Sequence, residues 1–507
     1  MKTPALLLLM ACAAVSGFPS HAAEAIRTTA EGVVRGEVQV DGSATFRRIP
    51  FAKAPVGELR WKPPQPMAKW SGQLDVRDPA IPCPQLDEGW NAGEAARGGE
   101  DCLTLAVREP KHAKDERLPV FVWIHGGSNR SGSGGRTVDS PIYKRGVILV
   151  SIEYRLGVFG FLASPELSAE SSHHTSGNYA LLDQIAALQW VRKNIANFGG
   201  DPTNVTLGGQ SAGAIDIAQL LRSPLAHSLF QKAILESGVL GPPRSAADNE
   251  AIGTALFEDF KLAKGATGLS ELRRLPVAQL LEASTRLKPP SGANYNLLWI
   301  EASADGWVLP VGANTVDRRA NQLGIPLIVG NNTSEFIFHG SLADARQMIG
   351  GLFGKNGPRA LQLYGLDSGD VTTDGTKSDE LGTRVLTDVL FRCPSIRLAN
   401  WTLADGKKAW RYEFGIPRPG SQIVEHNAEL DFVFGDEAAL KLTLARPPIQ
   451  KYWVNFMRSG DPNGSDVPPW PDLGSKRQYV AMLPNETRIG DDTGVRDSVC
   501  QLLDSGR

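Results

Sequence analysis

Short continuous runs of apolar residues alternate along the chain with segments whose apolar positions recur at helical spacing. The runs are typical of strands buried on both faces, and they lie at residues 118–124, 146–152, 205–209, 232–237 and 325–330. Between Asn178 and Phe198 apolar residues return every three or four positions, which predicts a helix, and residues 212–221 have the same character. This alternation predicts an α/β fold, with a mostly parallel central sheet and helices on both faces.

The chain gives no sign of division into several domains. No internal repeat, low-complexity stretch or long Gly/Ser or Pro linker interrupts its 507 residues. A large α/β fold can exceed the usual length of one domain, so we expect residues 23–507 to form a single domain. The segment at about 245–290 is mostly helical, and we expect it to be a cap inserted over the site.

The first 22 residues have the pattern of an export signal. Lys2 precedes a short apolar core, and Ser20-His21-Ala22 fits a small-x-small cleavage site, so the mature chain should start near Ala23. The predicted location is therefore secreted or periplasmic. A lipoprotein acylated at Cys12 is the alternative, but Met10 matches that pattern poorly. No later segment is long and apolar enough to be transmembrane.

Composition excludes some classes of partner. Apolar residues make up 42% of the chain and charged residues 21%, which is ordinary for a soluble protein with a large core. The formal charge of −2 provides no basic surplus for binding nucleic acid. Nothing in the sequence specifies the oligomeric state.

Cysteine usage agrees with export. Beyond the signal, four cysteines remain, which are Cys83, Cys102, Cys393 and Cys500. An even number in an oxidising compartment suggests two disulfides, and four cysteines allow three pairings. Cys83 with Cys102 is the most local pair. A zinc site is the weaker interpretation of these cysteines, because there is no C-x-x-C pair and no nearby histidine cluster.

Residues 209–213 form the strongest chemical motif. Gly209-Gln210-Ser211-Ala212-Gly213 fits G-x-S-x-G and joins a predicted strand to a predicted helix. In that context the pattern makes a strained turn that presents the serine hydroxyl at the carboxyl edge of the sheet. The alternative is a glycine-rich turn with an incidental serine. The flanking strand and helix favour Ser211 as a nucleophile.

A serine nucleophile needs a base, and the base an acid partner. In this type of fold the order along the chain is Ser, acid, His. His227 lies on or beside a predicted surface helix, and His339 follows the acid too closely, so His426, in the loop beyond a strand-like segment, is the predicted base. Glu335 follows the apolar run at 325–330 and is the predicted acid.

Asp305 is the nearest competitor for the acid, but its Asp-Gly dipeptide is more typical of a turn.

A glycine-rich loop after the first buried strand could stabilise the oxyanion of an acyl-transfer reaction. The segment "WIHGGSNRSGSGG" at 123–135 would direct backbone N–H groups, with that of Ala212, at the developing charge. Two alternatives are weaker. His125 has no second metal ligand nearby, and no G-K-[ST] follows the glycines to support phosphate binding. The predicted chemistry requires no metal and no cofactor.

Beyond these motifs, the chain resembles the type-B carboxylesterases, the cholinesterase-like branch of the α/β-hydrolases, from about residue 27 to 500. The resemblance rests on "IPFAKAPVGELRWKPPQP", "EDCLTLAV", "EYRLGVFGFL", "NYALLDQIAALQWVRKNIANFGGDPTNVTLGGQSAGA", "SPLAHSLFQKAILESG", "VEHNAELDFVFG" and "YWVNFMRSGDPNG". It implies the α/β-hydrolase fold.

Several residue roles follow from the resemblance alone. It implies Ser211 as nucleophile, Glu335 as acid and His426 as base. The oxyanion donors it implies are the amides of Gly127, Ser128 and Ala212, with Gly126 beside them. It also implies the pairings Cys83–Cys102 and Cys393–Cys500.

Three residues depart from the family's pattern. Gln210 stands where a glutamate usually precedes the nucleophile, which removes a negative charge and disfavours a choline ester as substrate. Ser128 replaces a common third glycine, and a positive φ there would cost about 1–2 kcal/mol. Phe336 follows the acid where glycine is usual and could narrow the pocket. None of these departures removes a predicted catalytic residue.

The sequence therefore predicts a serine hydrolase that cleaves a small-molecule carboxylic ester through an acyl-enzyme. The same three residues could serve a thioester, an amide or a lactone, because all are acyl transfers. A non-catalytic adhesion or binding protein is the alternative from another class. Such members of the family typically lack one of the three residues, and this chain has all of them.

Overall fold

The computed structural model describes residues 23–135, 137–238, 243–288, 301–312, 324–367, 375–418, 420–421, 423–435, 449–474 and 476–505. The predicted signal segment at 1–22, and with it Cys12, lies outside the described residues. Within the described part, no helix is both long and apolar enough to cross a membrane.

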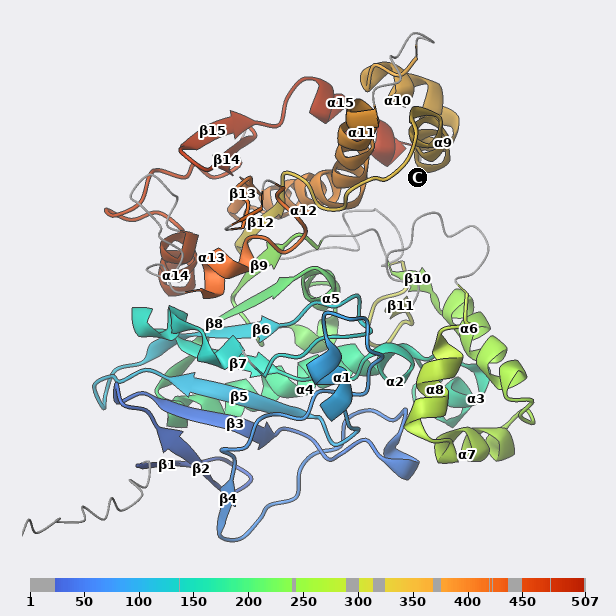
Figure 1. Ribbon diagram of the computed structural model, residues 1–507. Coiled ribbons are helices and arrows are strands. Elements are labelled where there is room, and N and C mark those ends of the chain that lie inside the picture. The colour runs from blue at the N-terminus through green and yellow to red at the C-terminus, as the bar shows by residue number, and fades with distance from the viewer. Residues whose placement is uncertain are drawn as a thin grey trace, which may run out of the picture.

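One large sheet organises the chain (Figure 1). Its central strands are all parallel, in the order β7, β6, β8, β9, β12, β13, β14. Their bounds are Ile148–Ile152 (β7), Leu118–Ile124 (β6), Gly200–Gln210 (β8), Lys232–Glu236 (β9), Leu327–Asn332 (β12), Ala409–Phe414 (β13) and Gln478–Met482 (β14). The predicted mostly parallel sheet is confirmed, and the carboxyl ends of these strands meet at one edge.

Antiparallel strands extend the sheet on both sides, and the apolar runs did not predict them. β1, β2, β3 and β5 continue it beyond β7, and β15 continues it beyond β14, while the short β4 pairs with β2. Their bounds are Glu24–Thr28 (β1), Val33–Val38 (β2), Ala44–Pro50 (β3), Gln73–Asp75 (β4), Thr104–Glu109 (β5) and Thr487–Asp491 (β15). Several of these strands are partly exposed, so their sequences lack a continuous apolar run.

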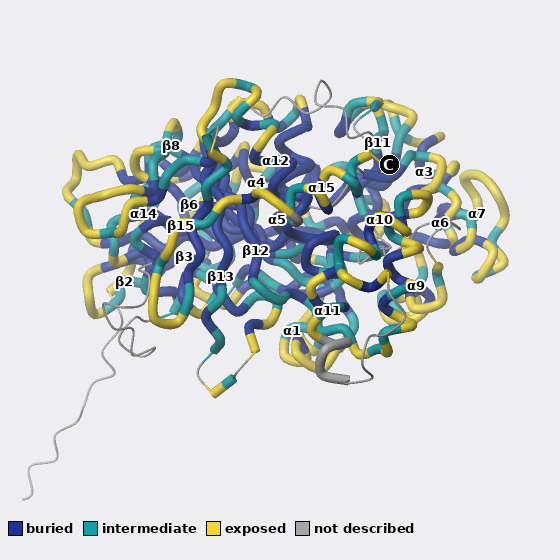
Figure 2. Tube along the Cα trace, turned by 90° about the horizontal axis from the view of Figure 1, so that it is seen from above, coloured by how far each residue is buried: buried dark blue, intermediate teal, exposed yellow. Residues whose placement is uncertain are grey.

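The central strands are apolar throughout because helices cover both of their faces. Every residue of β6 is buried, and the dark core of Figure 2 follows these strands. Val120 and Val122 pack into a core on one face that includes residues of helices α4 (Tyr179–Asn194) and α5 (Ala212–Leu220). Phe121 and Trp123 pack into a core on the other face that includes residues of helices α13 (Leu430–Phe434) and α14 (Ile449–Ser459). This alternation is the period of two that a strand imposes.

Of the helices before residue 300, α4 and α5 pack against the sheet, and α6, α7 and α8 occupy the predicted insertion. Their bounds are Ala92–Arg97 (α1), Gly157–Phe161 (α2), Pro165–Glu170 (α3), Tyr179–Asn194 (α4), Ala212–Leu220 (α5), Ala246–Asp259 (α6), Ala266–Arg274 (α7) and Val277–Ser284 (α8). The last three occupy the segment expected to be a helical insertion, and they lie together at one side in Figure 1. Two short strands, Arg244–Ser245 (β10) and Ser303–Ala304 (β11), pair in parallel beside them.

The C-terminal helices build a third apolar core beside the sheet. Their bounds are Leu342–Phe353 (α9), Gly357–Leu363 (α10), Gly375–Thr387 (α11), Cys393–Ala404 (α12), Leu430–Phe434 (α13), Ile449–Ser459 (α14) and Val495–Ser505 (α15). Residues of α9, α10, α11, α12 and α15 form this third core. A disulfide between Cys393 and Cys500 joins α12 to α15, and a second joins Cys83 to Cys102. These are the pairings that the resemblance implies.

Candidate active site

Ser211 stands at the corner between β8 and α5. Its φ is +55° and its ψ is −125°, a conformation that costs a non-glycine residue on the order of 1–3 kcal/mol. Two backbone hydrogen bonds hold it. The Ser211 N–H donates to the Glu236 carbonyl at 2.9 Å, and the Ile215 N–H donates to the Ser211 carbonyl at 3.0 Å. The strained turn expected from the motif is therefore present.

The motif glycines let β8 and α5 lie directly against β6. A Cβ added to Gly213 would lie 2.1 Å from the carbonyl oxygen of Ile124. One added to Gly209 would lie 2.8 Å from the same oxygen. Since both distances are below any real Cβ contact, a side chain at either position would push the nucleophile's turn out of place.

His426 and Glu335 are in direct contact. The imidazole Nδ1 lies 2.6 Å from Glu335 Oε2, and the His426 backbone N–H donates to the Glu335 carbonyl at 3.0 Å. Glu335 follows β12 and His426 lies in the loop after β13. Because these strands are parallel neighbours, their loops leave the sheet at the same edge.

Apolar rings hold the imidazole of His426 in place. The rings of Phe336 and Phe391 lie 4.8 Å and 5.3 Å from it, centroid to centroid. Glu335 is only 3% exposed, so its charge is poorly solvated and depends on its hydrogen bonds. Phe336, one of the three departures from the family's pattern, thus packs against His426, the predicted base.

Asn332 anchors both loops, a role that sequence reasoning missed. Its backbone N–H donates to Glu335 Oε1 at 2.7 Å. Its side-chain amide donates to the Glu425 carbonyl at 2.9 Å and to Glu429 Oε2 at 2.7 Å. Burial, and secondarily the charge of Glu335, raises the pKa of Glu429 to about 7. The position of Asn332 just after the apolar run at 325–330 was the only local signal in the sequence.

The second imidazole nitrogen faces the strand that carries Ser211, the predicted nucleophile. His426 Nε2 lies 3.2 Å from the side-chain nitrogen of Gln210, the residue before Ser211. Among the described residues, no hydrogen bond joins Nε2 to the Ser211 hydroxyl. The amide N–H can donate only to an unprotonated Nε2, which requires the proton of a neutral ring to sit on Nδ1, facing Glu335.

Replacing Gln210 with glutamate is expected to move the acidic limb of the pH–rate profile upward by about 1–2 pH units. A carboxylate beside Nε2 favours the imidazolium ion, and the base acts only when neutral. The measurement is kcat/KM against pH for a short-chain nitrophenyl ester. Gln210→Met, which is neutral and of similar size, is the control. Superimposable profiles for Gln210→Glu and wild type would show that Gln210 has no electrostatic contact with the base.

The predicted donor loop lies against the nucleophile. A Cβ added to Gly126 would be 3.1 Å from Ser211 Cβ. The φ angles of Gly127 and Ser128 are +112° and +56°, so Ser128 adopts the left-handed conformation despite its side chain. In the described part of the chain, the N–H groups of Gly127, Ser128 and Ala212 donate to no protein acceptor. They are therefore available to an oxyanion.

Hydrogen bonds between buried polar side chains hold the donor loop in place. Asn129 Nδ2 donates to Asp216 Oδ1 at 3.1 Å, and Gln184 Nε2 donates to Asp216 Oδ2 at 2.6 Å. Burial raises the pKa of Asp216 to about 7. These residues were not predicted from the sequence. An aspartate within the otherwise apolar segment 212–221 was the only local signal.

His125 and Glu153 form a second buried pair behind the loop. His125 Nδ1 bonds to the Gly126 carbonyl at 2.8 Å, and Ser133 Oγ donates to Glu153 Oε1 at 2.6 Å. Burial lowers the pKa of His125 to about 4 and raises the pKa of Glu153 to about 8. Both groups are therefore neutral at pH 7. His125 braces the loop, in place of the metal-ligand role considered from the sequence.

Glu153→Gln is expected to make folding less sensitive to alkaline pH. From the usual value near 4.5 up to pH 8, folded Glu153 keeps a proton that the unfolded chain has lost, so stability falls as pH rises. His125 acts oppositely, but only between about pH 4 and 6.5. From pH 6.5 to 8 the wild type should lose about 1–2 kcal/mol more than the variant. Urea denaturation at each pH measures this difference, and parallel curves would contradict it.

The competing residues lie elsewhere. Asp305 Oδ1 accepts the backbone N–H groups of Trp307, Val308 and Leu309, at 3.1, 2.9 and 2.9 Å, which is the turn its Asp-Gly dipeptide indicated. His227 ends a short 3₁₀ turn, Pro224–Ala226. His339 borders a separate surface cavity. No hydrogen bond joins any of these three to Ser211 in the described structure.

Comparisons with known proteins identify the family of this chain and agree with its fold. The model of the "Carboxylesterase family" matches residues 23–501. Carboxylesterase 1D of Rattus norvegicus is 32% identical, with 94% of this chain and 93% of that protein covered. Fumonisin B1 esterase of Sphingopyxis macrogoltabida is 33% identical, with 94% and 89% covered. Para-nitrobenzyl esterase of Bacillus subtilis (strain 168) is also 33% identical, with 92% and 96% covered.

Comparison with a solved structure indicates the same family and shows the fold. A structure of PNB esterase superposes with a TM-score of 0.80 at 31% identity, and the match covers 94% of this chain and 99% of that one. The fold is therefore that of the α/β-hydrolases, as the resemblance implied. With a family model matching almost the whole chain and relatives more than 30% identical over more than nine tenths of it, this chain belongs to the carboxylesterase family and is a carboxylic ester hydrolase.

Proposed function

We propose that Ser211, His426 and Glu335 act as nucleophile, base and acid in hydrolysis of a small-molecule carboxylic ester. The observation that carries this proposal is the Glu335–His426 pair, which faces the end of the strand that presents Ser211. The strained serine turn and the free backbone N–H groups beside it are what acyl transfer requires.

The first step is attack on the ester carbonyl. His426 Nε2 takes the Ser211 proton as the oxygen adds to the carbonyl carbon, and Glu335 stabilises the imidazolium through Nδ1–H. Since Nε2 contacts Gln210 in the structure, this step needs the serine side chain to turn toward the ring and displace the amide. Hydrogen bonds of this kind are often loose without substrate and tighten when it binds.

The N–H groups of Gly127, Ser128 and Ala212 would hold the oxyanion of the tetrahedral intermediate. Each such donor typically lowers the barrier by about 3–4 kcal/mol. The C–O bond to the alcohol then breaks, and His426 returns its proton to the leaving oxygen. Water, activated by the same histidine, releases the acid from the acyl-enzyme.

The bond that is cleaved can be tested with matched substrates. We expect the protein to hydrolyse nitrophenyl acetate, and to hydrolyse the corresponding nitroanilide at least about 10³-fold more slowly, because an amide nitrogen is a poorer leaving group than a phenolate. Comparing kcat/KM for ester, thioester, lactone and anilide measures this preference. Faster turnover of the anilide or lactone would assign the site to that alternative. No turnover of any of them, with the protein folded, would favour a non-catalytic binding protein.

We further propose export, with residues 1–22 as the signal. Two disulfides support this location, because disulfides persist in oxidising compartments. We also propose that residues 23–507 form one catalytic domain in which α6, α7 and α8 are an insertion beside the site.

A further inference from the structure

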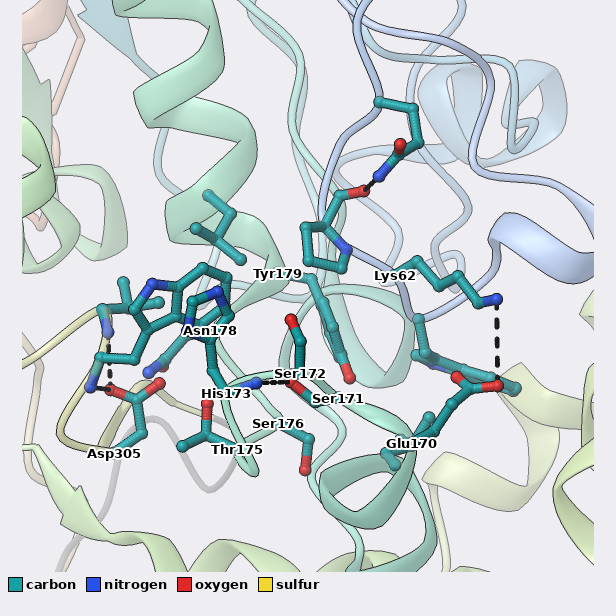
Figure 3. A pocket seen from close by; sticks show the side chains of 17 residues that line it. Lys62, Glu170, Ser171, Ser172, His173, Thr175, Ser176, Asn178, Tyr179 and Asp305 are labelled. Carbon is teal, nitrogen blue, oxygen red and sulfur yellow. Dashed lines mark hydrogen bonds and ion pairs between the residues drawn. The ribbon is translucent and has the colours of Figure 1, made fainter. Parts of the chain in front are cut away.

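A second cavity lies away from the proposed catalytic residues. It has a volume of about 380 Å³, and Figure 3 shows the side chains that line it. The walls come from three segments, which are 61–65, 167–182 and 305–308. Neither the triad nor the donor loop contributes to them. Its size falls at the lower end of the range for small-molecule sites, about 300–1,000 Å³.

Two polar groups of the wall are buried without a partner. Asp305 uses Oδ1 for the three backbone N–H groups of its turn, while Oδ2 is buried and has no donor among the described residues. The Thr175 hydroxyl is likewise buried and unbonded in the described structure. Figure 3 shows the free oxygen of Asp305 on the side toward Thr175 and His173. A buried acceptor without a donor is energetically unfavourable. A ligand that donates a hydrogen bond to this wall would therefore be stabilised.

An aromatic surface stands beside these groups. The rings of His173 and Trp307 are stacked 3.7 Å apart at 9°, and both line the cavity. The rings of Tyr179 and Trp61 also line the cavity. Flat rings next to polar groups suit a ligand that has an apolar face and polar edges.

The charges of the wall compensate one another. Both carboxylate oxygens of Glu170 accept from Arg273, at 2.8 and 2.6 Å, and Lys62 lies 3.9 Å from the same carboxylate. The Asp305 carboxylate is held by backbone N–H groups. Among the described residues Glu170 is thus paired with cations, while Asp305 keeps one carboxylate oxygen that can accept a hydrogen bond from a ligand. The hydroxyls of Ser171 and Ser172 also line the cavity, and a hydroxyl can both donate and accept. The Ser176 hydroxyl is already bonded to Ser164 and Ser168.

We propose that this cavity binds a neutral sugar ring, with its apolar face on the His173–Trp307 pair and a hydroxyl donating to Asp305 Oδ2. A pyranose has an apolar face of C–H groups and an edge of vicinal hydroxyls, which matches the aromatic surface and the adjacent polar wall. The site would hold a sugar, or the sugar part of a larger ligand, independently of the catalytic centre.

Isothermal titration of the full chain with xylose, glucose and galactose tests this directly. We expect at least one of them to bind with a Kd of about 1–10 mM, as is usual for a few hydrogen bonds and one stacking contact. Xylobiose and cellobiose form a second arm. Tighter binding of a disaccharide would indicate that the ligand is part of a longer glycan, and equal binding a free monosaccharide.

Two variants localise the binding. Asp305→Asn keeps the Oδ1 acceptor of the turn but replaces Oδ2 by a donor, and should weaken sugar binding at least about 10-fold, the effect of losing one good hydrogen bond. Trp307→Leu should remove detectable binding. Trp90→Leu is the matched control, because Trp90 is 64% exposed and outside the cavity.

Hydrolysis of nitrophenyl acetate should be unchanged in all three variants, which separates this inference from the proposed catalytic function. No binding of any sugar at about 50 mM, well above the expected Kd, would overturn the inference, and so would unchanged affinity in Trp307→Leu.

Discussion

Ser211→Ala should lower kcat for nitrophenyl acetate by about 10⁶-fold while KM changes little. The hydroxyl contributes to the transition state, in which it bonds to the carbonyl carbon, much more than to substrate binding. The free N–H groups of Gly127, Ser128 and Ala212 remain, so a residual rate above that in water is expected. Single-turnover and steady-state kinetics measure both values.

We expect the Ser211→Ala protein to remain folded, so that its loss of activity reflects the missing hydroxyl. Alanine at the corner keeps Cβ, and both backbone hydrogen bonds of the turn remain. Ser459→Ala, an exposed serine at the end of α14, is the matched control and should retain full activity. Wild-type kcat in the folded Ser211→Ala protein would remove Ser211 from the mechanism.

Glu335→Gln should lower kcat by about 10³–10⁴-fold without unfolding the protein. Glu335 Oε1 accepts the Asn332 N–H, so the amide of the variant keeps its oxygen there and turns its NH₂ toward His426 Nδ1. Two donors cannot face each other, and the ring proton therefore moves to Nε2. A histidine in that tautomer cannot accept the proton of Ser211.

Glu425→Gln is the control for loss of a nearby negative charge. Glu425 precedes His426 but is exposed, and its side chain makes no hydrogen bond with the imidazole among the described residues. It should change kcat less than about twofold, because exposed charges are screened. Equal losses in the two variants would show that Glu335 acts through general electrostatics rather than by orienting the base.

The parts of the fold that could be predicted are those where burial leaves a direct mark on the sequence. β6, β7 and β9 are buried on both faces and appear as unbroken apolar runs. The turn at Ser211 was predictable because the close approach of the Ile124 carbonyl excludes side chains at Gly209 and Gly213, which leaves the two glycines visible in the sequence. The outer strands β1 and β2 were not predictable, since they are partly exposed and their sequences lack a continuous apolar run.

The supports of the site could not be predicted because they join residues far apart in the chain. Asn129 reaches Asp216, and Gln210 reaches His426 across the sheet edge. A polar residue among apolar neighbours shows only that some partner exists. Gln210 was predicted to alter the charge of the pocket, but its contact with the base depends on how the loop after β13 returns to the end of β8.

Reaction with a fluorophosphonate, followed by peptide mass spectrometry, tests the central claim most directly. Such a reagent phosphylates a serine only when a base removes its proton beside an oxyanion site. We expect stoichiometric labelling of the peptide containing Ser211, and loss of labelling in Glu335→Gln. An unlabelled protein, or a label on any other residue, would contradict it.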